Sequence, residues 1–190
     1  MAKQVRVAIV VAMFSIVVEC RIPLLGRKTW NIRKFVDTPE KIWTYNTSNR
    51  RNIRCKVDVK QFVTPTSLFF NRWYKFGAEK IYQGFKANFD TKHKECMLLH
   101  SKGSIESECI IYYDKGAGCA VIEVKPGNAQ HTFYDLRVQD SFITEGPSSE
   151  CVRIFTKQGV QREVTYDARC KNIFSHNAKS SLSMRQRRNP

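Results

Sequence analysis

The stretch ECMLLHSKGSIESEC, residues 95–109, decides the fold of this chain because it has the pattern of a short β-hairpin. A two-residue turn at Lys102-Gly103 sets the register of two strands that run in opposite directions. Counting outward from that turn places Cys96 directly opposite Cys109, at a non-hydrogen-bonded pair whose Cα atoms lie about 4.5 Å apart. A disulfide bond tolerates this separation. The spacing therefore predicts a covalent bridge across a hairpin.

The chain on both sides of this hairpin repeats the same alternation of side chains, with turn residues roughly every ten positions. The predicted strands are CKVDVKQF (55–62), SLFFNRWYKF (67–76), EKIYQGFKANF (79–89), ECMLLH (95–100), SECIIYYD (107–114), CAVIEV (119–124), HTFYDLRV (131–138) and ECVRIFT (150–156). They predict an all-β fold, an eight-stranded antiparallel up-and-down barrel, because closure pairs every edge and leaves an interior for one small ligand. A two-sheet sandwich fits the same pattern and stays open as the alternative.

Short helical segments are expected at the two ends of this barrel. Before the first strand, DTPEKIW (37–43) has Asp37 or Thr38 as a candidate N-cap and Pro39 in the first turn. These features predict a helix over residues 37–43.

The first 20 residues, MAKQVRVAIVVAMFSIVVEC, have the pattern of a secretory signal peptide, because Lys3 and Arg6 precede an uncharged apolar run. That run is too short to cross a bilayer, which takes about 20 apolar residues in a helix. A buried N-terminal strand or helix is the alternative. We expect cleavage after Cys20, a secreted extracellular protein and no membrane association. The remainder reads as one domain (21–174) and a disordered basic tail (175–190).

Cleavage at that point leaves six cysteines, an even number that predicts three disulfide bonds in an exported protein. Six cysteines allow 15 connectivities in principle. The four histidines are scattered and no C-x-x-C occurs, so neither a metal nor another cofactor is expected. The chain also lacks G-x-S-x-G, H-E-x-x-H and a glycine-rich phosphate loop. This pattern predicts a binding protein and not an enzyme.

Six segments, taken in order, resemble the salivary lipocalins of ticks, the histamine-binding protein family: IWTYNTS, CKVDV, CAVIEV, YDLRVQDSF, ECVRIF and TYDARC. The resemblance covers roughly residues 36–174. The general lipocalin signature G-x-W lacks its glycine here, although Trp43 stands near the expected place. The resemblance implies a lipocalin barrel.

The family's disulfide pattern, carried onto this chain, implies the pairs Cys55–Cys170 and Cys119–Cys151. The resemblance also implies a secreted monomer that sequesters a small host mediator: histamine, serotonin, a leukotriene or a fatty acid. A few members of the family bind a host protein instead. A host complement or coagulation protein is therefore the alternative partner.

The ligand-binding residues of the family's amine binders are only partly present. One of their carboxylates follows the cysteine of the CAV strand, where this chain has Ala120, and the other is retained as Asp135. Arg137 stands two residues further on, and a guanidinium can bind a carboxylate through two parallel hydrogen bonds. This slightly favours an anionic lipid over an amine. Periodicity alone instead turns Leu136 inward and leaves Asp135 and Arg137 in water.

A second candidate for binding an anion is Arg72, the only charge on one face of SLFFNRWYKF. A charge among large apolar neighbours needs a partner. The alternative is that Arg72 pairs with a structural acid, such as Asp58 or Glu123. Further predicted ligand contacts are Phe70, Tyr74, Phe85, Tyr112 and Ile122.

The net charge of +15 falls to +14 without residues 1–20. Such a surface attracts anions and polyanions such as heparan sulfate, with Arg50, Arg51 and Arg54 as one basic cluster. Nucleic acid is not expected as a partner of a secreted protein. Asn46-Thr47-Ser48 is a sequon, which predicts glycosylation at Asn46.

Overall fold

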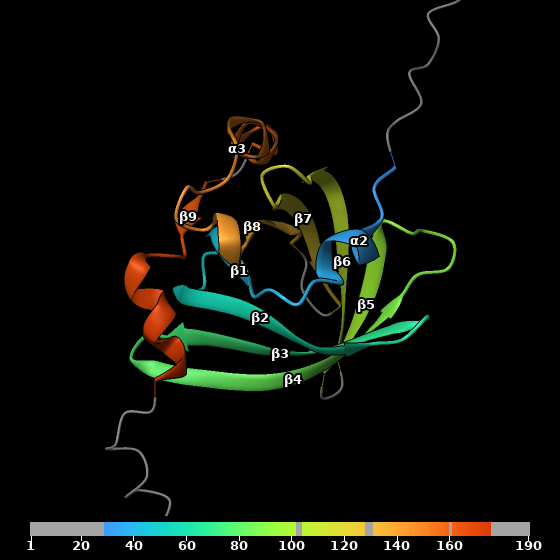
Figure 1. Cartoon of the computed structure of the whole chain (residues 1–190), viewed down its shortest axis with the longest axis horizontal. Coiled ribbons are helices and arrows are strands. Elements are labelled where there is room, and N and C mark those ends of the chain that lie inside the picture. The colour runs from blue at the N-terminus through green and yellow to red at the C-terminus, as the bar shows by residue number, and fades with distance from the viewer. Residues whose placement is uncertain (1–28, 102–103, 128–130, 160, 176–190) are drawn as a thin grey trace, which may run out of the picture.

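The strands form a single antiparallel sheet that closes on itself (Figure 1). The computed structural model describes residues 29–101, 104–127, 131–159 and 161–175. The strands are β1 (Ile42–Thr47), β2 (Ile53–Val63), β3 (Ser67–Phe76), β4 (Glu79–Phe89), β5 (Cys96–Ser101), β6 (Ser104–Asp114), β7 (Cys119–Pro126), β8 (Phe133–Gln139) and β9 (Glu163–Val164). Because β1 pairs with both β2 and β8, strands β1 to β8 form a closed up-and-down barrel. The predicted barrel is confirmed, and the sandwich alternative is wrong.

Two predicted elements differ from the structure. Residues 150–156, predicted as a strand, belong to helix α3 (Ser149–Thr156). Ser148 caps this helix, and the buried side chains of Cys151 and Phe155 are four positions apart, so they share one helical face. The eighth strand of the barrel is β1 instead. It begins at Ile42, inside the segment 37–43 that was predicted to be a helix.

Helix α2 (Ile32–Val36) replaces the helix predicted at residues 37–43. Asn31 caps its N-terminus, and Asp37 follows its last residue as the C-cap. The helix lies at one end of the barrel, next to β6 (Figure 1). Ile32, Phe35 and Val36 are buried there in one cluster with interior side chains such as Met97. This helix therefore closes one end of the barrel.

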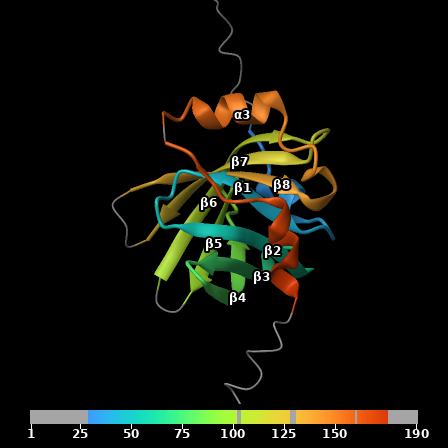
Figure 2. The same ribbon diagram turned by 90° about the vertical axis from the view of Figure 1, so that its left-hand side faces the viewer.

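A second apolar cluster lies on the outside of the barrel wall. Helix α3 packs against β6, β7 and β8, and Figure 2 shows it on the outer side of the sheet. Val121, Leu136 and Val138 are completely buried in this cluster, together with Phe155 of α3. Their burial explains why periodicity alone pointed the wrong way along β8. The apolar face of this strand is outside, under a covering segment, and its polar face is inside.

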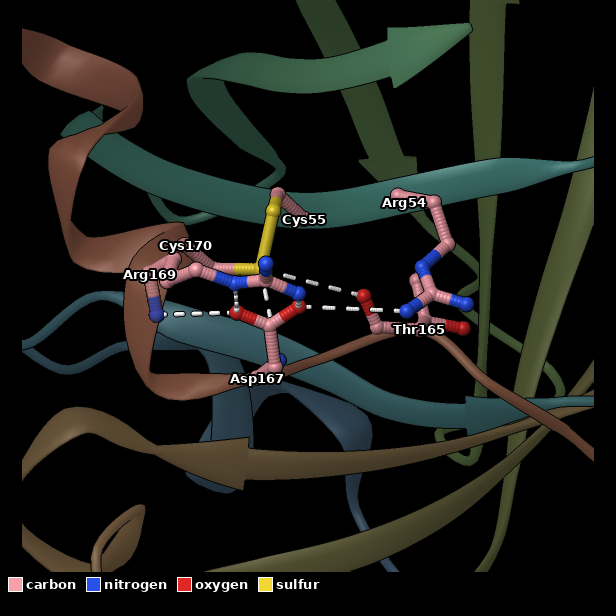
Figure 3. The surroundings of a disulfide bond; sticks show 6 residues. All are labelled: Arg54, Cys55, Thr165, Asp167, Arg169 and Cys170. Atoms are coloured by element: carbon pink, nitrogen blue, oxygen red, sulfur yellow. Dashed lines mark hydrogen bonds and ion pairs between the residues drawn. A yellow bond between two sulfur atoms is a disulfide. The ribbon is translucent and has the colours of Figure 1, made fainter. Parts of the chain in front are cut away.

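The C-terminal segment is fixed to the barrel by a disulfide and by polar contacts (Figure 3). Cys55 of β2 is bonded to Cys170 of the 3-10 helix η2 (Ala168–Phe174). Asp167 caps η2 and forms ion pairs with Arg169 at 3.2 Å and with Arg54 at 3.8 Å. These contacts hold η2 against the outer side of β2.

All three disulfide bonds have the expected partners: Cys55–Cys170, Cys96–Cys109 and Cys119–Cys151. The hairpin pair lies in register, with Cα atoms 4.1 Å apart. Among the described residues, no helix is long and apolar enough to cross a membrane. The predicted signal peptide, the Lys102-Gly103 turn and residues 176–190 of the predicted tail lie outside the described residues.

Candidate ligand-binding site

A cavity of about 880 Å³ opens at the barrel end opposite α2. Its mouth is lined by described residues between β1 and β2 and between β7 and β8, among them Arg50, Arg51 and His131. Deeper in the barrel, strand residues form the walls and the base: Lys56, Arg72, Tyr74, Gln83, Phe85, Leu99, Glu106 and Phe133. Ligand cavities in proteins commonly measure about 300–1,000 Å³. The space therefore suits a small organic molecule with an apolar body.

Arg72 occupies the base of this cavity and already has carboxylate partners. Its guanidinium donates to both oxygens of Asp58, at 2.6 and 2.8 Å, and to Glu108 at 2.9 Å. The rings of Phe70 and Phe85 lie 5.3 and 5.1 Å from its central carbon. Pairing with Asp58 was the alternative to ligand binding, and it is what the structure shows. Glu123, the other acid considered, instead pairs with Lys125.

Arg137 lies deeper in the barrel than Arg72 and also has carboxylate partners. It donates two hydrogen bonds to Glu108, at 2.6 and 2.8 Å, and two to Asp135, at 2.9 and 3.3 Å. Asp135 in turn accepts from Lys56 at 2.8 Å and from Thr47 at 2.7 Å. Both Asp135 and Arg137 therefore point into the barrel, as the resemblance implied. They bind each other and their neighbours across the interior.

Together these side chains form what we call the charged floor, a network that crosses the barrel beneath the cavity. Its members are Lys56, Asp58, Arg72, Glu106, Glu108, Asp135 and Arg137. Charges are costly to bury unless each is paired and hydrogen-bonded. The deepest members of the network are all paired and hydrogen-bonded. In total, however, the network contains three cations and four carboxylates. One carboxylate is therefore in excess.

The pKa values show which carboxylates the network neutralises. Burial alone would raise the pKa of Asp135, but Lys56 and Arg137 outweigh it and bring the pKa down to about 2. Glu108 behaves in the same way, because Arg137 and Arg72 hold its pKa far below the ordinary value despite its burial. Both groups are thus ionised at neutral pH.

Glu106 is the exception. Burial raises its pKa, the negative charge of Glu108 raises it further, and Arg72 offsets these effects only partly. Its closest cation is Arg72, at 3.6 Å, and its side chain is 29% exposed to the cavity that it lines. A positively charged group beside Glu106 would balance the charged floor. The charged floor is therefore one positive charge short of neutrality at Glu106, although Lys56 and Arg72 line the same cavity.

The eight predicted ligand contacts separate into four groups. Arg72, Tyr74 and Phe85 line the cavity. Phe70 and Arg137 lie beneath it, on a much smaller void. Asp135 and Ile122 are completely buried and line neither space.

Tyr112 is the one predicted contact that faces away from the interior, and this prediction is wrong. The pairing of β6 with β7 shifts between Ile110 and Tyr112, which marks a β-bulge. A bulge adds one residue to a strand and reverses the faces beyond it. Tyr112 consequently packs with the outer cluster and contacts the edge of Trp30, while Tyr113 joins the inner cluster.

The predicted glycosylation site is also poorly placed. Asn46 is 5% exposed in β1, opposite Leu136 of β8 and Val164 of β9. Its Oδ1 atom is buried and has no hydrogen-bond partner among the described residues. Thr47 of the same sequon is buried too and bonds to Asp135. The folded barrel thus leaves little room for a glycan on this side chain, which argues against the modification.

Sequence reasoning missed Glu106, Glu108 and Lys56 as parts of the site. A signal was present, because Glu106 and Glu108 alternate with Ile110 and therefore share its face of the strand. Lys56 likewise shares a face of β2 with Asp58. Recognising these positions requires knowing that the face turns inward.

Comparison with known proteins supports the fold. No family model matches the sequence, and no curated protein matches it. The structure of AM182 in complex with serotonin matches with a TM-score of 0.58 at 16% identity, over 74% of this chain and 92% of that chain. Japanin from Rhipicephalus appendiculatus bound to cholesterol matches with a TM-score of 0.52 at 14% identity, over 70% and 96%. At these identities the likeness concerns the fold, and this chain has the lipocalin fold.

Proposed function

We propose that this chain is a secreted member of the tick salivary lipocalins and that it sequesters a small host amine. The ammonium of the ligand would lie beside Glu106, and its apolar body would lie against Tyr74, Phe85 and Phe133. The signal-peptide pattern and the three disulfide bonds support secretion. The structures of AM182 with serotonin and of japanin with cholesterol support a small-molecule ligand for this fold.

The observation that carries this proposal is the excess carboxylate of the charged floor. The preference for an anionic lipid rested largely on Arg72 and Arg137, and both guanidinium groups already form ion pairs with buried or partly buried carboxylates, those of Asp58, Glu108 and Asp135. A ligand carboxylate placed there would also meet the negative charge of Glu106. An ammonium would instead find one unneutralised carboxylate and aromatic walls, which attract cations.

An anionic lipid remains the second candidate because the mouth of the cavity is positively charged. Arg50 and Arg51 are exposed there, and His131 also lines the cavity. A fatty acid could place its carboxylate at the mouth and its chain in the cavity. This orientation is the reverse of the one expected from the sequence.

Titration calorimetry with serotonin, histamine and a fatty acid tests the choice between the two. Amine binding should weaken by roughly 10- to 150-fold in Glu106→Gln, because a hydrogen bond to a charged group contributes about 1.5–3 kcal/mol. Glu79→Gln is the matched control, since Glu79 is exposed at the start of β4 and does not line the cavity.

The dependence on pH provides a second readout. Amine binding requires an ionised Glu106, whose pKa is raised, so affinity should begin to fall at a pH above the ordinary glutamate value of about 4.3. Tight fatty-acid binding that Arg50→Gln weakens and Glu106→Gln leaves unchanged would show that the amine proposal is wrong.

A further inference from the structure

The outer surface of β3 and β4 combines aromatic rings and lysines on one strip of the barrel wall. In register across the two strands, Trp73 lies opposite Tyr82 and Lys75 opposite Lys80. Tyr82 is 53% exposed. Among the described elements, η2 covers only one end of these strands, and Figure 1 shows no other helix or strand on their outer side. Most of the strip thus faces solvent, whereas at the η2 end the Trp73 ring packs on Phe174 and the Lys80 ammonium donates to the Ser175 carbonyl oxygen.

Aromatic pairs stand at both ends of this strip. Trp73 and Tyr82 have ring centroids 4.3 Å apart, and further along the same face Phe62 stacks on Phe69, also at 4.3 Å. Trp73 and Phe69 are four residues apart on β3, so the two pairs are separated by about 14 Å. Phe62 is 54% exposed, so its ring is accessible to a partner from solvent.

The centre of the strip lacks bulky side chains. Gly84 of β4 lies opposite Asn71 of β3, between the two aromatic pairs. A Cβ atom on Gly84 would come within 3.5 Å of the Asn71 side-chain oxygen. The surface is therefore low and polar in the middle and aromatic at both ends, a shape that suits an elongated ligand with flat rings and hydroxyl groups.

Three lysines frame this strip and have no carboxylate partner in the part of the chain that the structure describes. The Lys80 ammonium lies 5.0 Å from the Trp73 ring, and that of Lys86 lies 5.7 Å from the Phe69 ring. Lys75 extends the positive charge beyond Trp73. Lys80 and Lys86 are six residues apart, so the charges cover about 20 Å of β4. Uncompensated cations over this length complement a polyanion.

We propose that this strip, Phe62, Phe69, Trp73, Lys75, Lys80, Tyr82 and Lys86, is a binding site for a sulfated glycosaminoglycan chain. Sugar rings would stack on the exposed rings of Phe62 and Tyr82, and sulfate groups would pair with the lysines. The site is separate from the cavity, because its side chains belong to the opposite face of the same strands from Arg72, Tyr74 and Phe85. It would hold the secreted protein at a glycan-covered surface while the cavity remains open.

The test is binding of the full-length secreted protein to a size-defined heparin oligosaccharide at several salt concentrations. The variant Lys75→Gln/Lys80→Gln/Lys86→Gln should weaken binding at least about tenfold and make it less dependent on salt, because fewer counterions are released. The matched control removes the same charge at exposed lysines elsewhere, Lys92→Gln/Lys115→Gln/Lys157→Gln. It should change affinity much less.

A second variant tests the role of the rings without altering charge. Tyr82→Ser should weaken heparin binding severalfold, whereas Tyr82→Phe should retain it. Equal losses in the two triple variants would overturn the proposal by showing a general charge effect, and so would unchanged binding in the first triple variant. Preferential binding to anionic lipid vesicles, or self-association lost in Tyr82→Ser, would assign the strip to a different occupant. Amine affinity should be the same in all these variants, so the cavity proposal is tested separately.

Discussion

Replacing Arg137 by methionine should strongly destabilise the barrel. The substitution keeps much of the side-chain volume but removes the cation that bonds to Glu108 and Asp135, both of which are completely buried. Removing one partner of a buried ion pair leaves an uncompensated charge and typically costs about 3–5 kcal/mol. We expect a loss of this size in the free energy of unfolding at neutral pH.

Urea unfolding of the disulfide-bonded protein, followed by tryptophan fluorescence, measures this loss. Trp43 is 1% exposed and should report the transition. A lower midpoint with an unchanged slope would indicate a change in stability alone. Arg153→Met is the matched control, because Arg153 pairs with Glu150 on the surface of α3. Exposed ion pairs contribute little, so this control should unfold almost like the parent protein.

The stability lost in Arg137→Met should depend on pH. Asp135 and Glu108 have lowered pKa values in the folded state, so they stabilise the parent protein above the unfolded value of about 4. This contribution is lost as the pH falls toward 2. In Arg137→Met it is largely absent at every pH, so the difference between the two proteins should shrink on acidification.

Adding Glu108→Gln to Arg137→Met should recover part of the lost stability, because the unpaired buried carboxylate is removed. If Arg137→Met unfolds at the same urea concentration as Arg153→Met, or if the loss does not change with pH, the charged floor does not carry the electrostatic energy inferred for it.

Three further predictions concern the frame of the barrel. In the loop-entropy model, removing the Cys55–Cys170 bridge, which spans 115 positions, should lower the free energy of unfolding by about 4.8 kcal/mol. Removing the hairpin bridge, which spans 13 positions, should lower it by about 2.9 kcal/mol. Urea unfolding of the two double-alanine variants measures both losses, and the reverse order would contradict the prediction. Gly118→Ala should destabilise by about 1–3 kcal/mol, since φ is +55° and the new Cβ would lie 2.3 Å from the Phe142 ring, and an unchanged melting temperature would contradict this. Asn46 should be unmodified in protein secreted from insect cells, and a mass shift on glycosidase treatment would disprove it.

Much of the frame could be predicted from local sequence. β3 and β4 have the predicted bounds, and the other barrel strands derived from alternation differ by a few residues at their ends. Alternation with period two and regularly spaced turns depend on neighbouring residues, so they are visible in sequence. The pairing of Cys96 with Cys109 depends only on counting from a tight turn and needed no information about the rest of the chain.

The tertiary structure alone decided which face of each strand is the interior. Leu136 and Val138 look like core residues and are buried outside the barrel, because α3 and the C-terminal segment cover them. Asp135 and Arg137 look like surface residues and lie inside, because Lys56 and Glu108 meet them from strands 79 and 29 positions away. Alternation is the same whether a face contacts water, a ligand or a distant segment. The charged side chains of the charged floor come from strands that are far apart in sequence. Only closure of the barrel brings these charges together.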